Sequence, residues 1–155
     1  MCVNVKLSTK GEYGVRALVH LACNYNEGPI SLREISKIED ISYQYLEQIF
    51  LDLRRNSLVL SVRGAKGGYT LASHPKEITV GDVIRAVEGP IAPVSCVAKS
   101  TNSENTECDR SSTCAPRGVW LELRDRISEV LDEFTLQDLA VTDNDIEKLR
   151  GEHNE

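Results

Sequence analysis

The feature that most constrains this chain is a glycine-rich turn between two strand-forming runs, placed directly after a helical segment. Residues 58–72, LVLSVRGAKGGYTLA, predict a β-hairpin with the glycines at its turn. Ser42 can cap the preceding helical segment, YQYLEQIFLDLRRN. This segment places Leu46, Ile49, Phe50 and Leu53 at the spacing of one buried helical stripe. A hairpin that follows such a helix, itself preceded by two helical segments, is typical of a winged helix-turn-helix.

The helix starts carry a common signal, a Ser or Thr followed three positions later by an acid. This capping-box pattern satisfies free backbone donors at a helix N-terminus. The pairs are Thr9/Glu12, Ser31/Glu34, Thr79/Asp82 and Thr135/Asp138. They predict a first helix over 9–24, a short second helix, SLREISKI, whose apolar face holds Leu32, Ile35 and Ile38, and a later helix, TVGDVIRAVEGP.

A long helix is predicted near the end of the chain, in GVWLELRDRISEVLDEF. Its apolar residues recur every three or four positions and form a narrow seam: Trp120, Leu123, Ile127, Val130 or Leu131, and Phe134. We expect a second copy to cover this seam in a homodimer, which would match a palindromic double-stranded DNA operator. The alternative is that the seam packs back onto its own domain.

The predicted fold is therefore mainly α with a small β-hairpin: a winged helix-turn-helix plus a long dimerisation helix. The expected units are a DNA-binding domain at 1–90, a cysteine loop at 91–117, the dimerisation helix and a short helix at 118–140, and an acidic tail at 141–155. No apolar run approaches the length of a membrane span, and the start of the chain does not resemble a signal peptide. We expect a cytoplasmic protein that does not contact a membrane.

Charge is distributed unevenly along the chain. Residues 1–76 hold ten Lys and Arg against seven Asp and Glu, whereas the whole chain has a net charge of −6. The N-terminal part alone is suited to face phosphate, although ordinary solvated surfaces give the same composition.

The start of the helix in YQYLEQIFLDLRRN is the end that usually enters a major groove. For base reading we expect Ser42, Gln44, Glu47 and Gln48, because glutamine can pair with adenine and glutamate can accept a hydrogen bond from cytosine N4. Tyr43 is expected to contact phosphate, stack in the core or do neither. A solvated helix face is the alternative for the whole set.

Four cations near this helix and the hairpin are further candidates for DNA contact. Arg54 and Arg55 suit phosphate or carboxylate pairing, and Arg63 and Lys66, near the hairpin tip, suit a minor groove or phosphates. Solubilising charges on a hairpin are the alternative.

Three cysteines, Cys96, Cys108 and Cys114, lie in a run of Ser, Thr and Asn with the spacing C-x11-C-x5-C. Soft thiolates favour iron-sulfur clusters, zinc or copper(I), and the spacing lacks the close C-x2-C pairs of a structural zinc site. Two other interpretations of these cysteines remain open: a redox-active thiol group, and a disordered loop whose cysteines are merely reactive. Cys23 falls within the pattern of the first helix and is expected in the core.

Several stretches together resemble one known family: KLSTKGEYGVRALVHLA, SYQYLEQIFLDLRRN, SVRGAKGGYTLA, ITVGDVIRAVEGPI and TLQDLA. They are similar to the iron-sulfur cluster regulator family, the IscR-like winged-helix transcription factors. The resemblance implies a dimeric regulator and a cluster on Cys96, Cys108 and Cys114, 2Fe-2S rather than 4Fe-4S. It also links Glu47 to the choice between operator classes.

The fourth cluster ligand departs from the pattern of many family members. They place a histidine three residues after the last cysteine, where this chain has Arg117. By resemblance to the nitric-oxide-sensing repressors, Glu12 of the other subunit is the candidate ligand. Its alternative role is the acid of the Thr9 capping box.

No convergent catalytic motif is present, and the glycines of RGAKGG do not open a helix as a phosphate loop would, so we expect no enzyme. The expected mechanism is that cluster assembly orders the cysteine loop and alters how two winged domains fit two half-sites. The alternative is a cluster-free winged-helix repressor regulated by thiol oxidation or by a partner protein.

Overall fold

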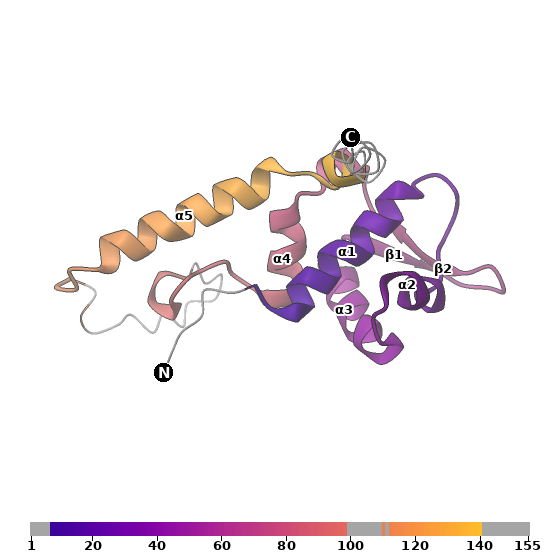
Figure 1. Cartoon of the computed structure of the whole chain (residues 1–155), viewed down its shortest axis with the longest axis horizontal. Helices are drawn as coiled ribbons and strands as arrows, with labels where there is room; N and C mark the ends of the chain where they lie inside the picture. The colour runs from indigo at the N-terminus through magenta and orange to yellow at the C-terminus, as the bar shows by residue number, and fades with distance from the viewer. Residues whose placement is uncertain (1–6, 99–109, 111, 141–155) are drawn as a thin grey trace, which may run out of the picture.

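The computed structural model describes residues 7–98, 110 and 112–140, and it has the predicted class of fold (Figure 1). Its helices and strands occur in this order: α1 Thr9–Cys23, α2 Leu32–Glu39, α3 Tyr43–Arg55, β1 Val59–Val62, β2 Gly68–Leu71, the 3-10 turn η1 Pro75–Glu77, α4 Val80–Glu88, the 3-10 turn η2 Ser95–Val97, and α5 Arg117–Glu133. The described residues are mainly helical, with one two-stranded antiparallel sheet among them.

A tight turn joins α2 to α3 and sets the geometry of the helix-turn-helix. Asp40 ends α2 in the left-handed conformation, with φ 53°, and its backbone N–H donates to Ser36. Ile41 is buried in the turn, and the Ser42 hydroxyl accepts a hydrogen bond from the backbone N–H of Tyr45 at the start of α3. The predicted cap of α3 is confirmed.

The hairpin is fixed to the segment that enters α2. Ile30 and Tyr69 exchange backbone hydrogen bonds of 3.0 and 2.8 Å, which adds a bridge to the β1–β2 ladder. Gly68 allows this approach, because a Cβ there would collide with the backbone of Ile30. The wing is therefore held at a defined angle to the helix-turn-helix.

The core lies where α1, α3, α4 and β1 meet. The predicted stripe on α3, Leu46, Ile49, Phe50 and Leu53, is fully buried, as are Leu18, Ile35, Val59 and Val83. Leu136 comes from the far end of the chain and is also fully buried in this core. Residues 136–140 are helical and pack back onto the winged helix after α5.

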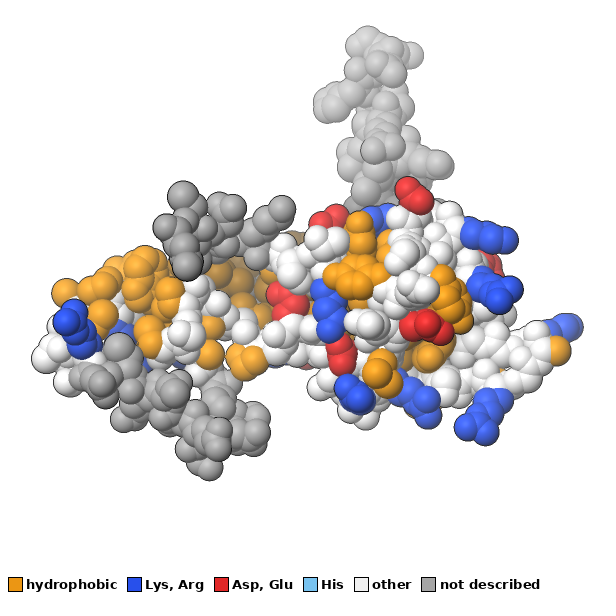
Figure 2. Space-filling model, turned by 90° about the horizontal axis from the view of Figure 1, so that it is seen from below, with side chains coloured by type: hydrophobic (Ala, Val, Ile, Leu, Met, Phe, Trp, Pro, Cys, Tyr) orange, Lys and Arg blue, Asp and Glu red, His pale blue; other side chains and the backbone are white. Residues whose placement is uncertain are grey.

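In contrast, α5 forms an arm that leads away from the winged helix (Figure 1). None of its residues is buried, and Val119 and Val130 are 62% and 54% exposed. Hydrophobic side chains gather along this arm at the left of Figure 2. The end of α5 is tied to the domain by the Val80 N–H, which donates to Phe134 at 2.9 Å, and by a bridge between Thr79 and Thr135.

Local details correct three expectations. Ser8, not Thr9, caps α1, because its side chain accepts from the Gly11 N–H and the helix begins at Thr9. Ile38 is 58% exposed, since its position on α2 points away from the core that buries Leu32 and Ile35. Cys23 is exposed at the last residue of α1 rather than in the core. Within the described residues, no helix is both long and apolar enough to cross a bilayer.

Candidate nucleic-acid interface and cysteine segment

The exposed face of α3 carries all the candidate base-reading residues. Opposite the buried stripe, the side chains of Ser42, Tyr43, Gln44, Glu47 and Gln48 are exposed to solvent. The helical period alone separates them from the core, because the buried positions recur every three or four residues. This face is therefore free to meet a ligand along the first two turns of the helix.

The two tyrosines near the start of α3 have different environments. Tyr45 is half-buried, and its ring packs edge-on against Tyr13 of α1 at 5.7 Å between centroids. Tyr43 is exposed and lies one helical turn before Glu47 on α3. Hydrogen bonding to Glu47 and the negative charge of that carboxylate raise the pKa of the Tyr43 hydroxyl above its ordinary value.

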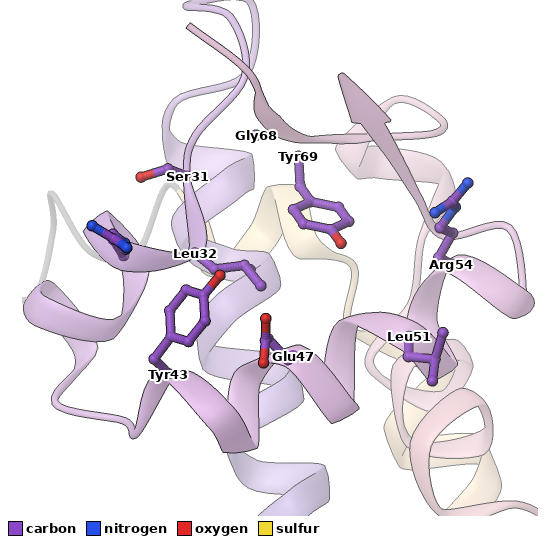
Figure 3. Close-up of a pocket in the computed structure, with 9 residues that line it drawn as sticks. Ser31, Leu32, Tyr43, Glu47, Leu51, Arg54, Gly68 and Tyr69 are labelled. Carbon is purple, nitrogen blue, oxygen red and sulfur yellow. The ribbon is translucent and has the colours of Figure 1, made fainter. Parts of the chain in front are cut away.

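A shallow hollow of about 440 Å³ lies between the start of α2, the exposed face of α3 and the base of the hairpin (Figure 3). Its lining is Ser31, Leu32, Arg33, Tyr43, Glu47, Leu51, Arg54, Gly68 and Tyr69. Arg33 and Tyr69 were not among the candidates from the sequence. Arg33 is an exposed cation in the first turn of α2, and the pairing of α2 with α3 in a helix-turn-helix is the signal that could have identified it.

The predicted cations surround this hollow and the wing. Arg63 and Lys66 are exposed at the hairpin tip: Arg63 precedes a turn that the Gly67 N–H closes on the Gly64 carbonyl at 3.0 Å, and Lys66 lies within that turn. Arg54 is exposed in the hollow, whereas Arg55 lies 3.6 Å from the Asp52 carboxylate. Lys and Arg side chains project around the end of the molecule that holds the winged helix in Figure 2. This distribution suits contact with phosphates.

Two of the three candidate cluster cysteines are described, and they lie near the two ends of the segment that joins α4 to α5. Cys96 is half-buried in η2, which packs on α5, where the Arg124 guanidinium donates to the Val97 carbonyl at 3.0 Å. Cys114 is half-buried just before α5, and its carbonyl accepts from the Arg117 N–H at 3.2 Å. Cys108 lies outside the described residues.

Glu12 is exposed in the first turn of α1, and no described residue forms a hydrogen bond or an ion pair with its carboxylate. Its proposed role as the acid of a Thr9 capping box is wrong, because Ser8 is the cap. The acid that does contact this end of α1 is Glu88, the last residue of α4, which accepts from the Ser8 N–H at 3.0 Å. This contact ties α1 to the start of the cysteine segment.

The thiols of Cys96 and Cys114 are chemically suited to an iron-sulfur cluster. Among the described residues, no three potential ligands form a group that could hold a metal, so one chain does not bring Glu12, Cys96 and Cys114 together. The Nε of Arg117, three residues after Cys114, is buried and has no hydrogen-bond partner within the described part of the chain. A thiolate or a sulfide is an acceptor that could satisfy this donor.

Comparison with known proteins places the chain among bacterial regulators. The HTH-type transcriptional regulator CymR of Bacillus subtilis is 46% identical over 136 residues, 88% of this chain and 90% of that protein. The regulator IscR of Aliivibrio salmonicida is 39% identical over 150 residues, 97% of this chain and 85% of that protein.

Comparison with solved structures identifies the same two regulators, CymR and IscR. The structure of B. subtilis CymR, described as that organism's global cysteine regulator, matches 89% of this chain and 98% of its own with a TM-score of 0.70 and 43% identity. T. potens IscR matches 91% of this chain and 89% of its own with a TM-score of 0.70 and 40% identity. The family model described as "Rrf2: Iron-dependent Transcriptional regulator" matches residues 7–142, and the chain belongs to the Rrf2 family of winged-helix transcriptional regulators.

Proposed function

We propose that this regulator is a homodimer that binds palindromic double-stranded DNA and holds an iron-sulfur cluster that controls its DNA affinity. The observation that carries the proposal is the position of the cysteines. Cys96 and Cys114 bracket the connection between the winged helix and the α5 arm, with Cys108 between them in sequence. A change of state at these thiols would act on that connection directly.

DNA binding is assigned to α3 and the wing. The exposed residues Ser42, Gln44, Glu47 and Gln48 would face base edges in a major groove. Arg54, Arg63 and Lys66 would pair with phosphates, or, for the wing residues, enter the adjacent minor groove. Tyr43 lies beside the base-reading residues on the same face.

The dimer is assigned to the uncovered apolar residues of α5. Val119, Val130 and Phe134 are all about half exposed or more, and apolar residues at this helical spacing are stable in water only when another surface covers them. A second copy of α5 offers the matching seam. Two winged helices related by a two-fold axis would then present two copies of α3 to two half-sites.

The cluster is assigned to the thiolates of Cys96, Cys108 and Cys114, with 2Fe-2S as the expected form and Glu12 of the partner subunit as the expected fourth ligand. When bound, the cluster supplies a labile cross-link between these side chains, and a carboxylate ligand makes it easier to lose than four thiolates would. The absence of any described partner for the Glu12 carboxylate within its own chain is consistent with this role.

The coupling to DNA follows from how the protein holds α5. Midway along its length, α5 contacts η2 through Arg124 and the Val97 carbonyl. At its end, Asp132 receives two hydrogen bonds from the Arg85 guanidinium of α4, at 2.8 and 2.7 Å. Drawing Cys96 and Cys114 toward a common centre would fix η2 against the start of α5, and so set the angle between the arm and the winged helix.

The test is to purify the full chain without oxygen and to measure iron, acid-labile sulfide and visible absorption. Wild type should be coloured, Cys108→Ser should lose iron and sulfide, and Glu12→Ala should bleach faster. Cys23→Ser, at the far end of α1, is the matched control and should keep its colour. A colourless wild type after reconstitution would exclude the cluster.

A second candidate is a cluster-free repressor that responds to thiol oxidation or to a partner protein. Its support is the 46% identity to CymR, whose structure is described as that of a global cysteine regulator. In that case an oxidant should change DNA affinity in a protein that never contains iron, and Cys108→Ser should remove the response. Under either candidate we expect the protein to act in the cytoplasm as a DNA-binding regulator without an enzymatic step.

A further inference from the structure

Cys96 lies in η2, a short turn that the protein holds against the middle of α5. η2 spans only Ser95–Val97, and no side chain caps its first residue. The Val97 side chain is buried, but not among the described residues that form the core of the winged helix, and η2 packs on α5. Because a three-residue turn has too few internal hydrogen bonds to fix itself in place, its contacts with α5 decide where Cys96 lies.

Arg124 supplies the polar part of this contact. Its Nη1 donates to the Val97 carbonyl at 3.0 Å, and its side chain is only 14% exposed although it carries a charge. The other two guanidinium nitrogens, Nε and Nη2, both lie 2.8 Å from Oδ1 of Asp125. Asp125 therefore holds the planar guanidinium so that Nη1 faces the carbonyl.

A hollow of about 890 Å³ lies between the start of the same segment and the second half of α5. Pro90 and Ile91 line it from the segment, and Ser128 and Glu129 line it from α5. The segment is therefore not packed against α5 where it leaves α4, and it meets the helix further along, at Arg124. This leaves the Arg124 contact to hold η2 and Cys96 on the helix.

The place of this contact matters because of where Cys114 lies. Arg124 follows the first residue of α5, Arg117, by seven positions, which is about 10 Å along the helix axis. Cys114 lies just before that first residue and is half-buried. Arg124 thus holds Cys96 beside the helix that Cys114 precedes, which limits the conformations of the chain that could separate the two thiols.

We propose that Arg124 is a positioning residue for Cys96: through the Val97 carbonyl it holds η2 on α5 and keeps the Cys96 thiol where the proposed cluster can meet it. This inference rests on the proposed function of the cysteines and names the side chain that places one of them. Without the guanidinium, the Val97 carbonyl would lose its donor, and η2 would leave α5 more often.

The first measurement uses the full chain in its reduced, iron-free form and follows alkylation of each cysteine by iodoacetamide. Cys23, Cys96 and Cys114 fall on different tryptic peptides, so mass spectrometry gives each rate separately. Arg124→Met keeps most of the aliphatic length but removes the donors, and Arg124→Lys keeps a charged donor. Asp125→Asn weakens the group that orients the guanidinium.

Arg126→Met is the matched control. It removes an equal charge two residues further along α5, but Arg126 is 72% exposed and pairs with Glu122 of the same helix. Thermal unfolding followed by circular dichroism shows that each variant is folded at the temperature of alkylation. The second measurement reconstitutes the proteins without oxygen and follows their visible absorption in the presence of a chelator.

Arg124→Met should raise the alkylation rate of Cys96 about tenfold and leave those of Cys23 and Cys114 unchanged. Asp125→Asn should raise it by about threefold or less, and Arg124→Lys should lie between wild type and Arg124→Met. Arg126→Met should match wild type in both measurements. The reconstituted Arg124→Met protein should bleach about tenfold faster than wild type.

Four results would overturn the inference. An unchanged Cys96 rate in Arg124→Met would mean that η2 keeps its place without the guanidinium. A slower rate would mean that Arg124 acts through its charge, because loss of a nearby cation lowers the thiolate fraction. An equal rise at Cys96 and Cys114 would mean that α5 loosens as a whole. Faster alkylation with unchanged bleaching would mean that the place of the thiol does not serve the cluster.

Failure of the proposed function gives a different result. A wild type without iron or sulfide after reconstitution would contradict the cluster. The alkylation rates of the iron-free proteins would still decide whether Arg124 positions Cys96.

Discussion

The winged helix and the α5 arm differ in how much of their apolar surface is buried within one chain. Phe50 and Leu18 are fully buried in the core of the winged helix, whereas α5 buries none of its residues. The winged helix is packed around its own core, and in the proposed dimer a partner surface covers the arm. The cysteine segment joins the two regions, so the proposed signal would act between the DNA-binding unit and the dimerisation unit.

Loss of a core side chain should have the largest effect. Phe50→Ala should lower the free energy of unfolding by about 3–5 kcal/mol, because it leaves a cavity among fully buried neighbours. Its neighbour Leu51 is 48% exposed, and Leu51→Ala should cost less than about 1 kcal/mol. Urea unfolding followed by circular dichroism measures both, and similar costs would mean that the core is not where the structure places it.

A charge on the arm should affect assembly instead of folding. Val130→Lys should raise the dimer dissociation constant by about 100-fold, because it buries an unpaired ammonium in the proposed seam. Leu60→Lys, on the hairpin and 54% exposed, is the matched control and should leave the dimer intact. Sedimentation velocity over a concentration series gives the measurement; a Val130→Lys variant that stays dimeric would place the dimer contact elsewhere.

The same substitution in two helices sharpens the contrast further. Gly81→Ala in α4 should give no net stabilisation, because the new Cβ would displace the exposed Asp132 carboxylate from Arg85, at a cost similar to the roughly 1 kcal/mol that alanine contributes through helix propensity. Gly118→Ala in α5 meets no atom within 4 Å and should stabilise the protein by about 0.5–1 kcal/mol through helix propensity. Thermal unfolding should therefore be unchanged in Gly81→Ala and shift upward in Gly118→Ala.

The smallest expected effect concerns the ion pair between Arg85 of α4 and Asp132 of α5. The hydrogen bonds from Arg85 lower the pKa of Asp132 below its ordinary value of 3.8, so the native state binds this proton less readily than the unfolded chain. The resulting stability is present above pH 3.8 and is lost as the pH falls through the lowered value.

Because the pair is 37% and 43% exposed, solvent screening limits its contribution to about 1 kcal/mol or less. Asp132→Asn should therefore be slightly less stable than wild type at pH 6, and the difference should shrink toward pH 3 in urea unfolding series. A difference that is constant with pH would mean that the ionised carboxylate is not what Arg85 recognises.

The parts of the fold that sequence could predict are those set by neighbouring residues. Ser31, Ser42 and Thr79 cap helices as predicted, and the α3 stripe and the hairpin follow local periodicity and turn chemistry. The cap of α1 was misassigned because Ser8 and Thr9 are adjacent and only the spacing to Glu12 distinguished them. Ile38 was misassigned because the direction of the core, not α2 itself, decides which face is buried.

The candidate site depends more on contacts between distant segments. The hollow combines Arg33 of α2, Glu47 of α3 and Tyr69 of β2, and no local pattern joins these three residues. The sequence did identify Glu47 and the exposed face of α3, because helical periodicity separates that face from the core.

The most direct test of the account is the DNA affinity of one preparation before and after cluster removal. The anaerobic full-length protein is titrated onto a selected palindromic duplex, the cluster is stripped with a chelator, and the titration is repeated alongside Cys108→Ser. The account predicts a change in Kd of about tenfold or more for wild type and none for Cys108→Ser. Equal affinity for both forms of the wild type would contradict control of α3 through the cysteine segment.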